Sequence, residues 1–256
     1  MCFATGDLGI GFLVNGEGHP REDVARLVRE LMSSIGWFNG VFVLTLCLVP
    51  GGALGVQEVV IVDFGQERNG VPPGWELMEK TGKAELSLVE DGNGRVLRLR
   101  SNSSSFAIQK EVDIDLKQTP FLEWQWKVTE MPRRGDFRNF STDDQAAQLY
   151  LVFTPDFMQK EVIAYIWDSN APKGITAEPT FPPVYPFLRI KVVVLESGEA
   201  EKGKWITETR NVVEDYRKLY GGHPGKIAGI RIQINSQHTK SRSEAYWRYL
   251  KVKGHP

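Results

Sequence analysis

The stretch TDDQAAQLYLVFTPDFMQKEVIAYIWD, residues 142–168, indicates the fold of this chain more clearly than any other. An acidic and polar loop leads into the run Leu149–Phe153, whose residues are apolar at every position. A second apolar run then returns and ends at Trp167 and Asp168. A short run that is apolar at every position predicts a strand covered on both sides. We therefore expect these two segments in the centre of a β-sandwich with a polar rim.

Three further segments alternate apolar and polar residues, as strands with one buried and one solvated face do. These segments are 106–116, 122–128 and 230–235. In the last one the isoleucines should face the core, and Arg231, Gln233 and Asn235 should face solvent. The sequence DGNG at 91–94 predicts a hairpin turn, because Gly and Asn accept the positive φ that such turns require.

One helix is predicted among these strands. Asn211 is suited to cap the free backbone N–H groups of a first turn, and Glu214 stands three residues later, as in a capping box. Gly221 and Gly222 then end the helix. Five prolines in 171–186 exclude a central strand there. We predict an all-β fold, a β-sandwich with one short helix over an edge or end.

The overall charge of the chain is close to zero. Its 256 residues carry a formal net charge of −1, and 41% of them are hydrophobic. This balance is ordinary for a globular protein and gives no electrostatic footprint for nucleic acid or an anionic membrane, so we expect neither as a partner. The oligomeric state stays open. Cys2 and Cys47 both precede the strands, so we expect no disulfide framework in the domain.

The N-terminal region is typical of an export signal. Residues 41–49, VFVLTLCLV, form an uncharged apolar run, a Pro-Gly-Gly break follows, and Ala53 and Gly55 place small residues at the cleavage positions. The run is too short for a transmembrane span of about 20 residues. We predict an extension with a signal peptide over 1–55, with the signal-like segment at 41–55. One β-sandwich domain over 56–256 would then be periplasmic or extracellular.

Three alternatives stay open for this region. Translation from Met32 rather than Met1 would bring the apolar run closer to the start. Residues 21–31 place apolar side chains at helical spacing, which is typical of an amphipathic helix that docks on the domain. The third is an anchor that is retained, or lipidated at Cys47, although Leu46 stands where lipidation requires a small residue.

The sequence lacks the signatures of the common enzyme classes. It has no GxSxG elbow, no P-loop and no GxGxxG after a strand. Its four histidines have no zinc-binding spacing. We therefore predict no catalytic residue, no metal and no cofactor.

The predicted ligand-binding residues are Asp143, Asp144, Gln145, Trp167, Asp168 and Trp205. The paired carboxylates before the central strand are suited to bind a polar ligand or a cation, to act as acid and base, or simply to cap a turn. Trp167 and Asp168 place an aromatic ring beside a carboxylate, a pairing that can stack a sugar and bind its hydroxyls, although a single Trp is more often a core residue. Trp205 lies in a turn before the helix and is expected near the surface.

Several of these motifs resemble one family. They are PFLEWQWKV (120–128), TDDQAAQLYLVF (142–153), YIWDSNAPKG (165–174), ESGEAEKGKWITETRNVVEDYRKLYG (196–221) and the closing IAGIRIQINSQHT and AYW. Together they are similar to the bacterial "domain of unknown function 3047" family, over about residues 59–252. Several ordered motifs at the expected spacing are more specific than any single tripeptide.

The resemblance implies an exported, single-domain bacterial protein with a jelly-roll or galactose-binding-like sandwich, a layout that often carries sugars. Fold alone does not determine function. The segment 235–239 reads NSQHT where the family pattern is rich in Asp. Hard cations require carboxylate and carbonyl oxygens, so a metal bound by this loop in relatives is in doubt here.

We expect an exported β-sandwich that binds a polar ligand, such as a carbohydrate or another envelope ligand, without catalysis. The first alternative is a carbohydrate-active enzyme with two carboxylates from the set Asp143, Asp144, Asp168, Asp215 and Glu244. The second is a structural or partner-binding envelope protein, for which a flat apolar patch would be the sign.

Overall fold

The computed structural model describes residues 58–68, 70–92, 94–154, 159–179 and 188–256. The predicted extension and signal segment lie outside these residues, as does the end of the proline-rich segment. Among the described residues, no helix is both long and apolar enough to cross a membrane.

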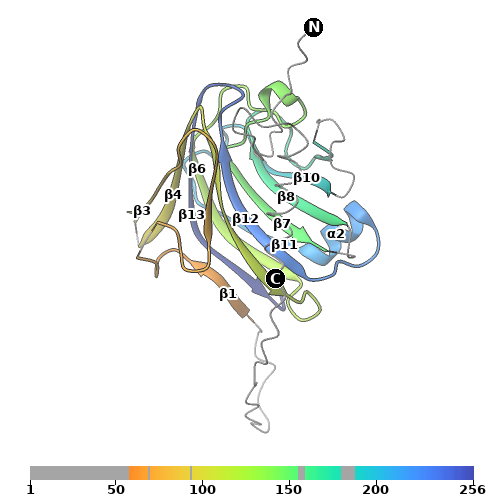
Figure 1. Ribbon diagram of the computed structural model, residues 1–256. Coiled ribbons are helices and arrows are strands. Elements are labelled where there is room, and N and C mark those ends of the chain that lie inside the picture. The colour runs from red at the N-terminus through yellow and green to blue at the C-terminus, as the bar shows by residue number, and fades with distance from the viewer. Residues whose placement is uncertain (1–57, 69, 93, 155–158, 180–187) are drawn as a thin grey trace, which may run out of the picture.

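The strands form two sheets (Figure 1). The order in the first sheet is β11 (Ile206–Asn211), β6 (Phe121–Glu130), β13 (Arg242–Lys253), β4 (Arg95–Asn102) and β3 (Glu85–Glu90), and β1 (Glu58–Asp63) also pairs with β13. The order in the second sheet is β2 (Glu76–Thr81), β5 (Ser105–Ile114), β12 (Ile227–Asn235), β7 (Ala147–Phe153), β8 (Lys160–Asp168), β10 (Leu188–Ser197) and β9 (Thr176–Ala177). The helical elements among the described residues are α2 (Val212–Tyr220) and a 3-10 turn at Phe140–Thr142.

The chain passes repeatedly from one sheet to the other. From β4 to β7 it alternates between the sheets at every strand, and it does so again from β11 to β13. Strands β8 and β10 pair in parallel, whereas the other paired strands are antiparallel. Such alternation between two packed sheets is typical of jelly-roll sandwiches. The fold is therefore all-β, as the sequence predicts.

Aromatic side chains fill the space between the sheets. The ring of Trp126 lies 5.6 Å from Trp124, 6.0 Å from Trp167 and 5.4 Å from Trp247, measured between ring centroids. All four indoles are fully buried. Since Trp167 comes from the second sheet and the other three from the first, this cluster joins the two sheets.

Most of the predicted strand faces are confirmed. The apolar positions of β5, β6 and β12 lie in the core between the sheets, and β7 is buried on both faces except at Val152. The hairpin is confirmed as well, because the Asp91 backbone N–H donates to Gly94 O at 3.0 Å between β3 and β4. Asn93 itself lies outside the described residues.

The prediction that Arg231, Gln233 and Asn235 face solvent is wrong. They do point away from the core between the sheets, but all three are buried. Gln233 and Asn235 are fully enclosed and make hydrogen bonds to other side chains of the second sheet. A polar residue can occupy such a position at little cost when its hydrogen bonds are made.

The helix lies where the sequence predicts it. Asn211 Oδ1 accepts a hydrogen bond from the Glu214 backbone N–H at 3.2 Å, and Gly221 and Gly222 have φ of 79° and 64°. Val212 and Tyr216 of α2 are buried in the core. The helix thus covers an edge of the sandwich beside β11 and β10 (Figure 1).

The aromatic cluster generates a stability prediction. We expect Trp126→Ala to lower the free energy of unfolding by about 3–5 kcal/mol, because it removes a fully buried ring that three other indoles contact. Lys117→Ala, at an exposed position, should change it by less than about 0.5 kcal/mol. Urea unfolding measures both values, and equal effects would contradict the proposed role of the cluster.

Candidate functional site

The carboxylate of Asp144 holds a loop. It accepts hydrogen bonds from the backbone N–H of Thr239 at 2.6 Å, from the Thr239 hydroxyl at 2.7 Å and from the backbone N–H of His238 at 3.3 Å. The side chain is fully buried. Three donors use most of its acceptor capacity, so Asp144 joins the segment before β7 to the loop between β12 and β13.

Asp143, the residue before Asp144, is also buried, but its carboxyl group has fewer hydrogen-bond donors around it. Burial raises the pKa of Asp143 to about 8, and the charges of Asp144 and Asp168 add to this effect. The Gln145 side-chain amide donates to Asp143 at 2.7 Å, which lowers the pKa only in part. Asp143 therefore keeps its proton at neutral pH, unlike an ordinary surface carboxylate.

Gln145 belongs to a buried hydrogen-bond network on the second sheet. Its backbone N–H donates to Asn235 at 2.8 Å, and the side chain of Gln148 donates to the same oxygen at 2.6 Å. Gln233 continues the network to Lys80, whose Nζ donates to it at 2.9 Å. The network crosses from β7 through β12 to β2. Its members are buried, which favours a structural role.

The space beside this network is small. A cavity of about 10 Å³ lies between Asp143, Gln145 and Tyr150 and their neighbours. This is about the volume that one water molecule requires. Among the described residues, the predicted acidic site therefore has no room for a sugar ring.

The structure places Trp167 and Asp168 in the interior. The indole is fully enclosed between the sheets and donates to Gly198 O at 3.1 Å, so its ring belongs to the core and offers no platform at the surface. Asp168 accepts backbone hydrogen bonds from Phe137 at 3.0 Å, Asn170 at 2.9 Å and Ala171 at 2.8 Å. Both residues are thus occupied by contacts within the protein.

Trp205 is half-buried on the outer face of the first sheet. Its indole N–H donates to Asp91 at 3.0 Å, and the Arg248 guanidinium lies 4.2 Å from the centre of its ring. Lys127 approaches the same ring at 4.9 Å. Two cations already contact this ring, and Trp205 lies on the outer face of the first sheet, whereas Trp167 lies in the core between the sheets.

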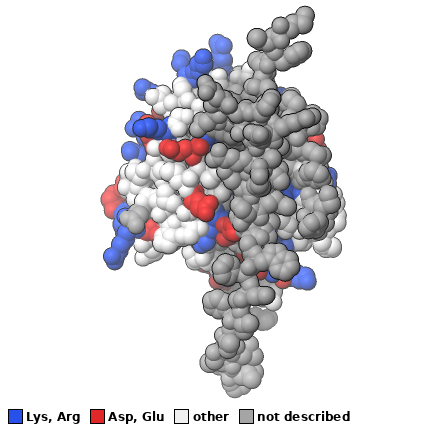
Figure 2. Space-filling model, viewed as in Figure 1, with Lys and Arg blue, Asp and Glu red and all other residues white. Residues whose placement is uncertain are grey.

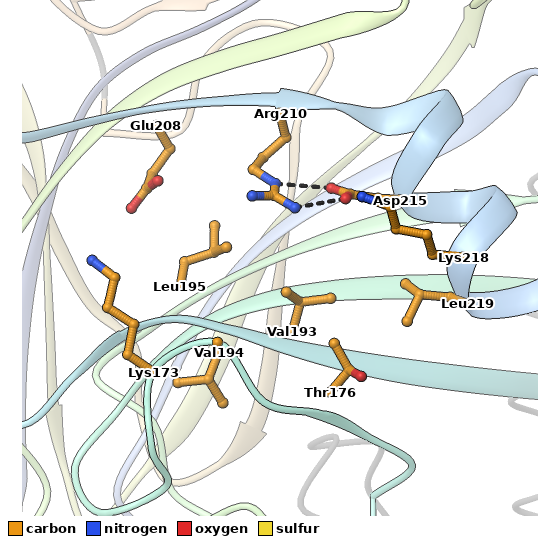
Figure 3. A pocket seen from close by; sticks show the side chains of 11 residues that line it. Lys173, Thr176, Val193, Val194, Leu195, Glu208, Arg210, Asp215, Lys218 and Leu219 are labelled. Atoms are coloured by element: carbon orange, nitrogen blue, oxygen red, sulfur yellow. Dashed lines mark hydrogen bonds and ion pairs between the residues drawn. The ribbon is translucent and has the colours of Figure 1, made fainter.

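A groove at the open edge of the sandwich is the more promising feature. It lies between the edge strand β11 and strand β10, with α2 at one end, and has a volume of about 290 Å³ (Figure 3). Small-ligand pockets span about 300–1,000 Å³, so the volume of the groove is close to the lower limit of that range. Its lining comprises Lys173, Gly174, Thr176, Val193, Val194, Leu195, Glu208, Arg210, Asp215, Lys218 and Leu219.

The pairing of β11 with β6 turns two charged side chains into this groove. Glu208 stands opposite Trp124, and Arg210 stands opposite Leu122. Opposite residues of an antiparallel pair project on the same face, and both partners on β6 are fully buried core residues. Glu208 and Arg210 therefore point into the space between the sheets, as Figure 3 shows.

Arg210 is held by α2. Its guanidinium donates two hydrogen bonds to Asp215, at 2.8 and 2.6 Å, and the Tyr165 hydroxyl donates to the same carboxylate at 2.8 Å. Such a bidentate pair has a defined geometry. It joins the first turns of α2 to the edge strand and forms one end of the groove.

Glu208 has no such partner. Its Oε1 is buried, and no described residue gives it a hydrogen bond. Burial is the main cause that raises the pKa of Glu208 to about 7, and the charge of Glu196 is the second. The indole N–H of Trp126 lies close enough to lower that pKa slightly, but the contact lacks the geometry of a hydrogen bond.

The cation whose charge affects Glu208 most, Lys173, is committed to another carboxylate. Lys173 donates to Glu196 at 2.5 Å, and Figure 3 shows its side chain pointing toward Glu208. The charge of Lys173 lowers the pKa of Glu208 less than burial and Glu196 raise it. The groove therefore contains one carboxyl group whose hydrogen-bonding capacity is unmet.

The sequence analysis did not select Glu208, Arg210 or Lys173. A signal was present, because Ile206, Glu208 and Arg210 alternate with Thr207 and Thr209. Charged residues that share the face of a core isoleucine on a strand are unusual.

The other two carboxylates proposed for an enzyme also have partners. Asp215 accepts from Arg210 and Tyr165, and Glu244 accepts from the Thr129 hydroxyl at 2.6 Å and pairs with Arg100 at 3.2 Å. No group of three or more metal-ligating side chains occurs within the described ranges.

With the fold and groove established, comparison with known proteins defines the class. Residues 73–251 match the family described as "Protein of unknown function (DUF3047)", and the chain belongs to this family. None of the curated proteins matches the chain.

Three solved structures show distant likeness. The family 11 carbohydrate-binding module of the cellulase Lic26A-Cel5E of Clostridium thermocellum has 11% identity and a TM-score of 0.42, with 77% of this chain and 94% of that chain covered. The Emp47p carbohydrate recognition domain has 14% identity and a TM-score of 0.40, with 79% and 98% covered. The family 11 xylanase from Neocallimastix patriciarum has 11% identity and a TM-score of 0.34, with 77% and 96% covered. At these values none of them transfers a ligand or an activity to this chain.

The environment of Asp143 predicts a pH dependence of stability. The folded protein keeps a proton on Asp143 up to about pH 8, whereas the unfolded chain releases it near its ordinary pKa of 3.8. Unfolding therefore becomes more favourable as pH rises between these values, by up to about 1.4 kcal/mol per pH unit. Asp143→Asn removes the titrating group, so its stability relative to the parent protein should increase from pH 4 to pH 8.

Urea unfolding at several pH values measures this difference. Asp113→Asn, which changes an exposed carboxylate, is the matched control and should show little change with pH. A constant difference between Asp143→Asn and the parent protein would show that Asp143 is ionised in the folded state.

Proposed function

We propose that this protein binds a small polar ligand of the carbohydrate type in the groove between β11 and β10, without catalysing its conversion. The observation that carries the proposal is the buried Oε1 of Glu208, which has no hydrogen-bond partner among the described residues. A buried acceptor without a partner costs about 1–3 kcal/mol. A ligand hydroxyl that donates to it would recover this free energy.

The rest of the groove suits both the apolar C–H face and the hydroxyl-rich edge of a sugar ring. Val193, Leu195 and Leu219 provide aliphatic contacts for the C–H face of a ring. Thr176 and Lys218 add polar groups at other points of the lining, within reach of a hydroxyl-rich edge. Apolar walls with a few placed polar groups are typical of small-molecule sites.

The surface charge does not favour a large charged partner. On the described part of the face shown in Figure 2, Lys and Arg side chains lie at several places along the margins, and acidic side chains lie among uncharged areas. Neither sign covers the described part of this face, and the formal net charge of the chain is −1, so broad electrostatic attraction gives little support to a polyanion or polycation as the partner.

Export belongs to the same proposal. The apolar run at 41–49, followed by Pro50 and the small residues Ala53 and Gly55, supports a secretory signal ahead of a domain over 56–256. A periplasmic or extracellular location would give the domain access to envelope or extracellular carbohydrates.

A thermal-shift screen of the full chain against mono- and oligosaccharides tests the function. A ligand present at 100 times its Kd should add about 2.7 kcal/mol to the free energy of unfolding. Glu208→Leu removes the carboxyl group and should abolish the shift. Glu199→Leu makes the same change at an exposed turn position and should retain it.

Two outcomes would contradict the proposal. One is the absence of any shift with a well-folded protein across the sugar classes. The other is a shift that persists in Glu208→Leu, which would place the ligand elsewhere on the molecule.

A further inference from the structure

The charges around Glu208 do not balance inside the groove. Arg210 is paired with Asp215 by two hydrogen bonds, and Lys173 is paired with Glu196 at 2.5 Å. Each pair sums to zero, so an ionised Glu208 is left as one negative charge. Lys218, the remaining charged residue of the lining, is exposed at the rim, where water screens it.

A neutral ligand would only partly correct this imbalance. A hydroxyl group satisfies one oxygen of Glu208 but leaves its charge uncompensated in a buried place. A protonated amine donates a hydrogen bond to Glu208 and also neutralises its negative charge. Hydrogen bonds between an ammonium and a carboxylate are about twice as strong as neutral ones.

The position of Glu196 strengthens the preference for a cation. Glu196 is buried, and its charge is the second cause that raises the pKa of Glu208. Two carboxylates that repel each other create a local negative potential, of which Lys173 compensates only one charge. A second cation placed at Glu208 would relieve this repulsion.

We propose that the groove selects an aminated carbohydrate, or a related polyol amine, whose ammonium group pairs with Glu208. This inference rests on the proposed function, since it requires a polar ligand in the same groove. It adds the charge of the ligand and assigns Glu208 as the residue that determines specificity.

Both cations that affect Glu208, Lys173 and Arg210, have pKa values above their ordinary ones. The hydrogen bond to Glu196 raises the pKa of Lys173. Burial lowers the pKa of Arg210, but the hydrogen bonds to Asp215 and the charges of Asp215 and Tyr165 together raise it above its ordinary value. Glu196 and Asp215 are held in the two ion pairs already described, and Lys218 is exposed on α2. Glu208 is therefore the group expected to titrate near pH 7.

The test compares glucamine with sorbitol, which differ only by an amine in place of one hydroxyl. An alkyl amine resembles the Lys side chain, whose ordinary pKa is about 10.4, so glucamine stays protonated from pH 5.5 to 7.5. Isothermal titration of the full chain at pH 7.5 should give a Kd for glucamine about tenfold lower than for sorbitol. At pH 5.5, where Glu208 takes up a proton, most of this preference should disappear.

Glu208→Gln separates the charge from the hydrogen bond. Its amide oxygen still accepts from a hydroxyl, so sorbitol should bind within about threefold of its original Kd, whereas the preference for glucamine should be lost. Glu199→Gln, at an exposed turn, should keep the preference. Circular dichroism and the melting temperature establish that each variant is folded.

The outcomes distinguish the two proposals. Equal affinity for glucamine and sorbitol, or a preference that survives in Glu208→Gln, overturns the selection for an amine and leaves polar-ligand binding intact. If neither compound binds and no sugar in the thermal-shift screen changes the melting temperature, both the proposed function and the selection for an amine are overturned.

Discussion

The groove depends on the register between β11 and β6. Because Ile206, Glu208 and Arg210 stand opposite core residues of β6, the edge strand directs two charged side chains into the space between the sheets. A shift by one residue would point Thr207 and Thr209 inward and turn both charges to solvent. The pairing that completes the first sheet thus also creates the polar lining of the open edge.

The hydrogen-bond partners of each carboxylate determine whether it is free to bind a ligand. Asp144 and Asp168 lie in the interior and accept hydrogen bonds from backbone N–H groups, so they hold loops together. Asp215 is equally occupied by Arg210 and Tyr165. Glu208 differs because it borders the groove with a buried oxygen to which no described residue donates a hydrogen bond. This contrast is why the proposed site lies on β11 and not at the acidic loop before β7.

The sequence predicted the strands well because their periodicity is local. Alternation in 122–128 placed Trp124 and Trp126 in the core, and the capping residue Asn211 placed the helix. The burial of Arg231, Gln233 and Asn235 could not be predicted in this way, since their partners come from segments far away in the chain. The alternation of apolar and polar residues predicted correctly which face of the strand these residues lie on. It could not show that this face is covered.

The candidate site was harder to predict for the same reason. The residues 206–210 alternate in sequence, but only the pairing with Trp124 and Trp126 shows that Glu208 points inward. Lys173 and Glu196 lie in other segments, and their contact with each other depends on the arrangement of β10 and the loop before β9. Trp167, by contrast, looked like a surface ring only because its strand end was read without the sheet that packs over it.

The most direct measurement is the titration of the Glu208 side-chain carboxyl carbon by NMR in the full chain, with Glu208→Gln used to assign the signal. We expect a midpoint near pH 7, and a lower midpoint in Glu196→Gln, because burial and the charge of Glu196 raise the pKa of Glu208. A midpoint near its ordinary pKa of 4.5 would contradict the account. The carboxylate would then be solvated or paired, and the groove would hold no unmet group for a ligand to satisfy.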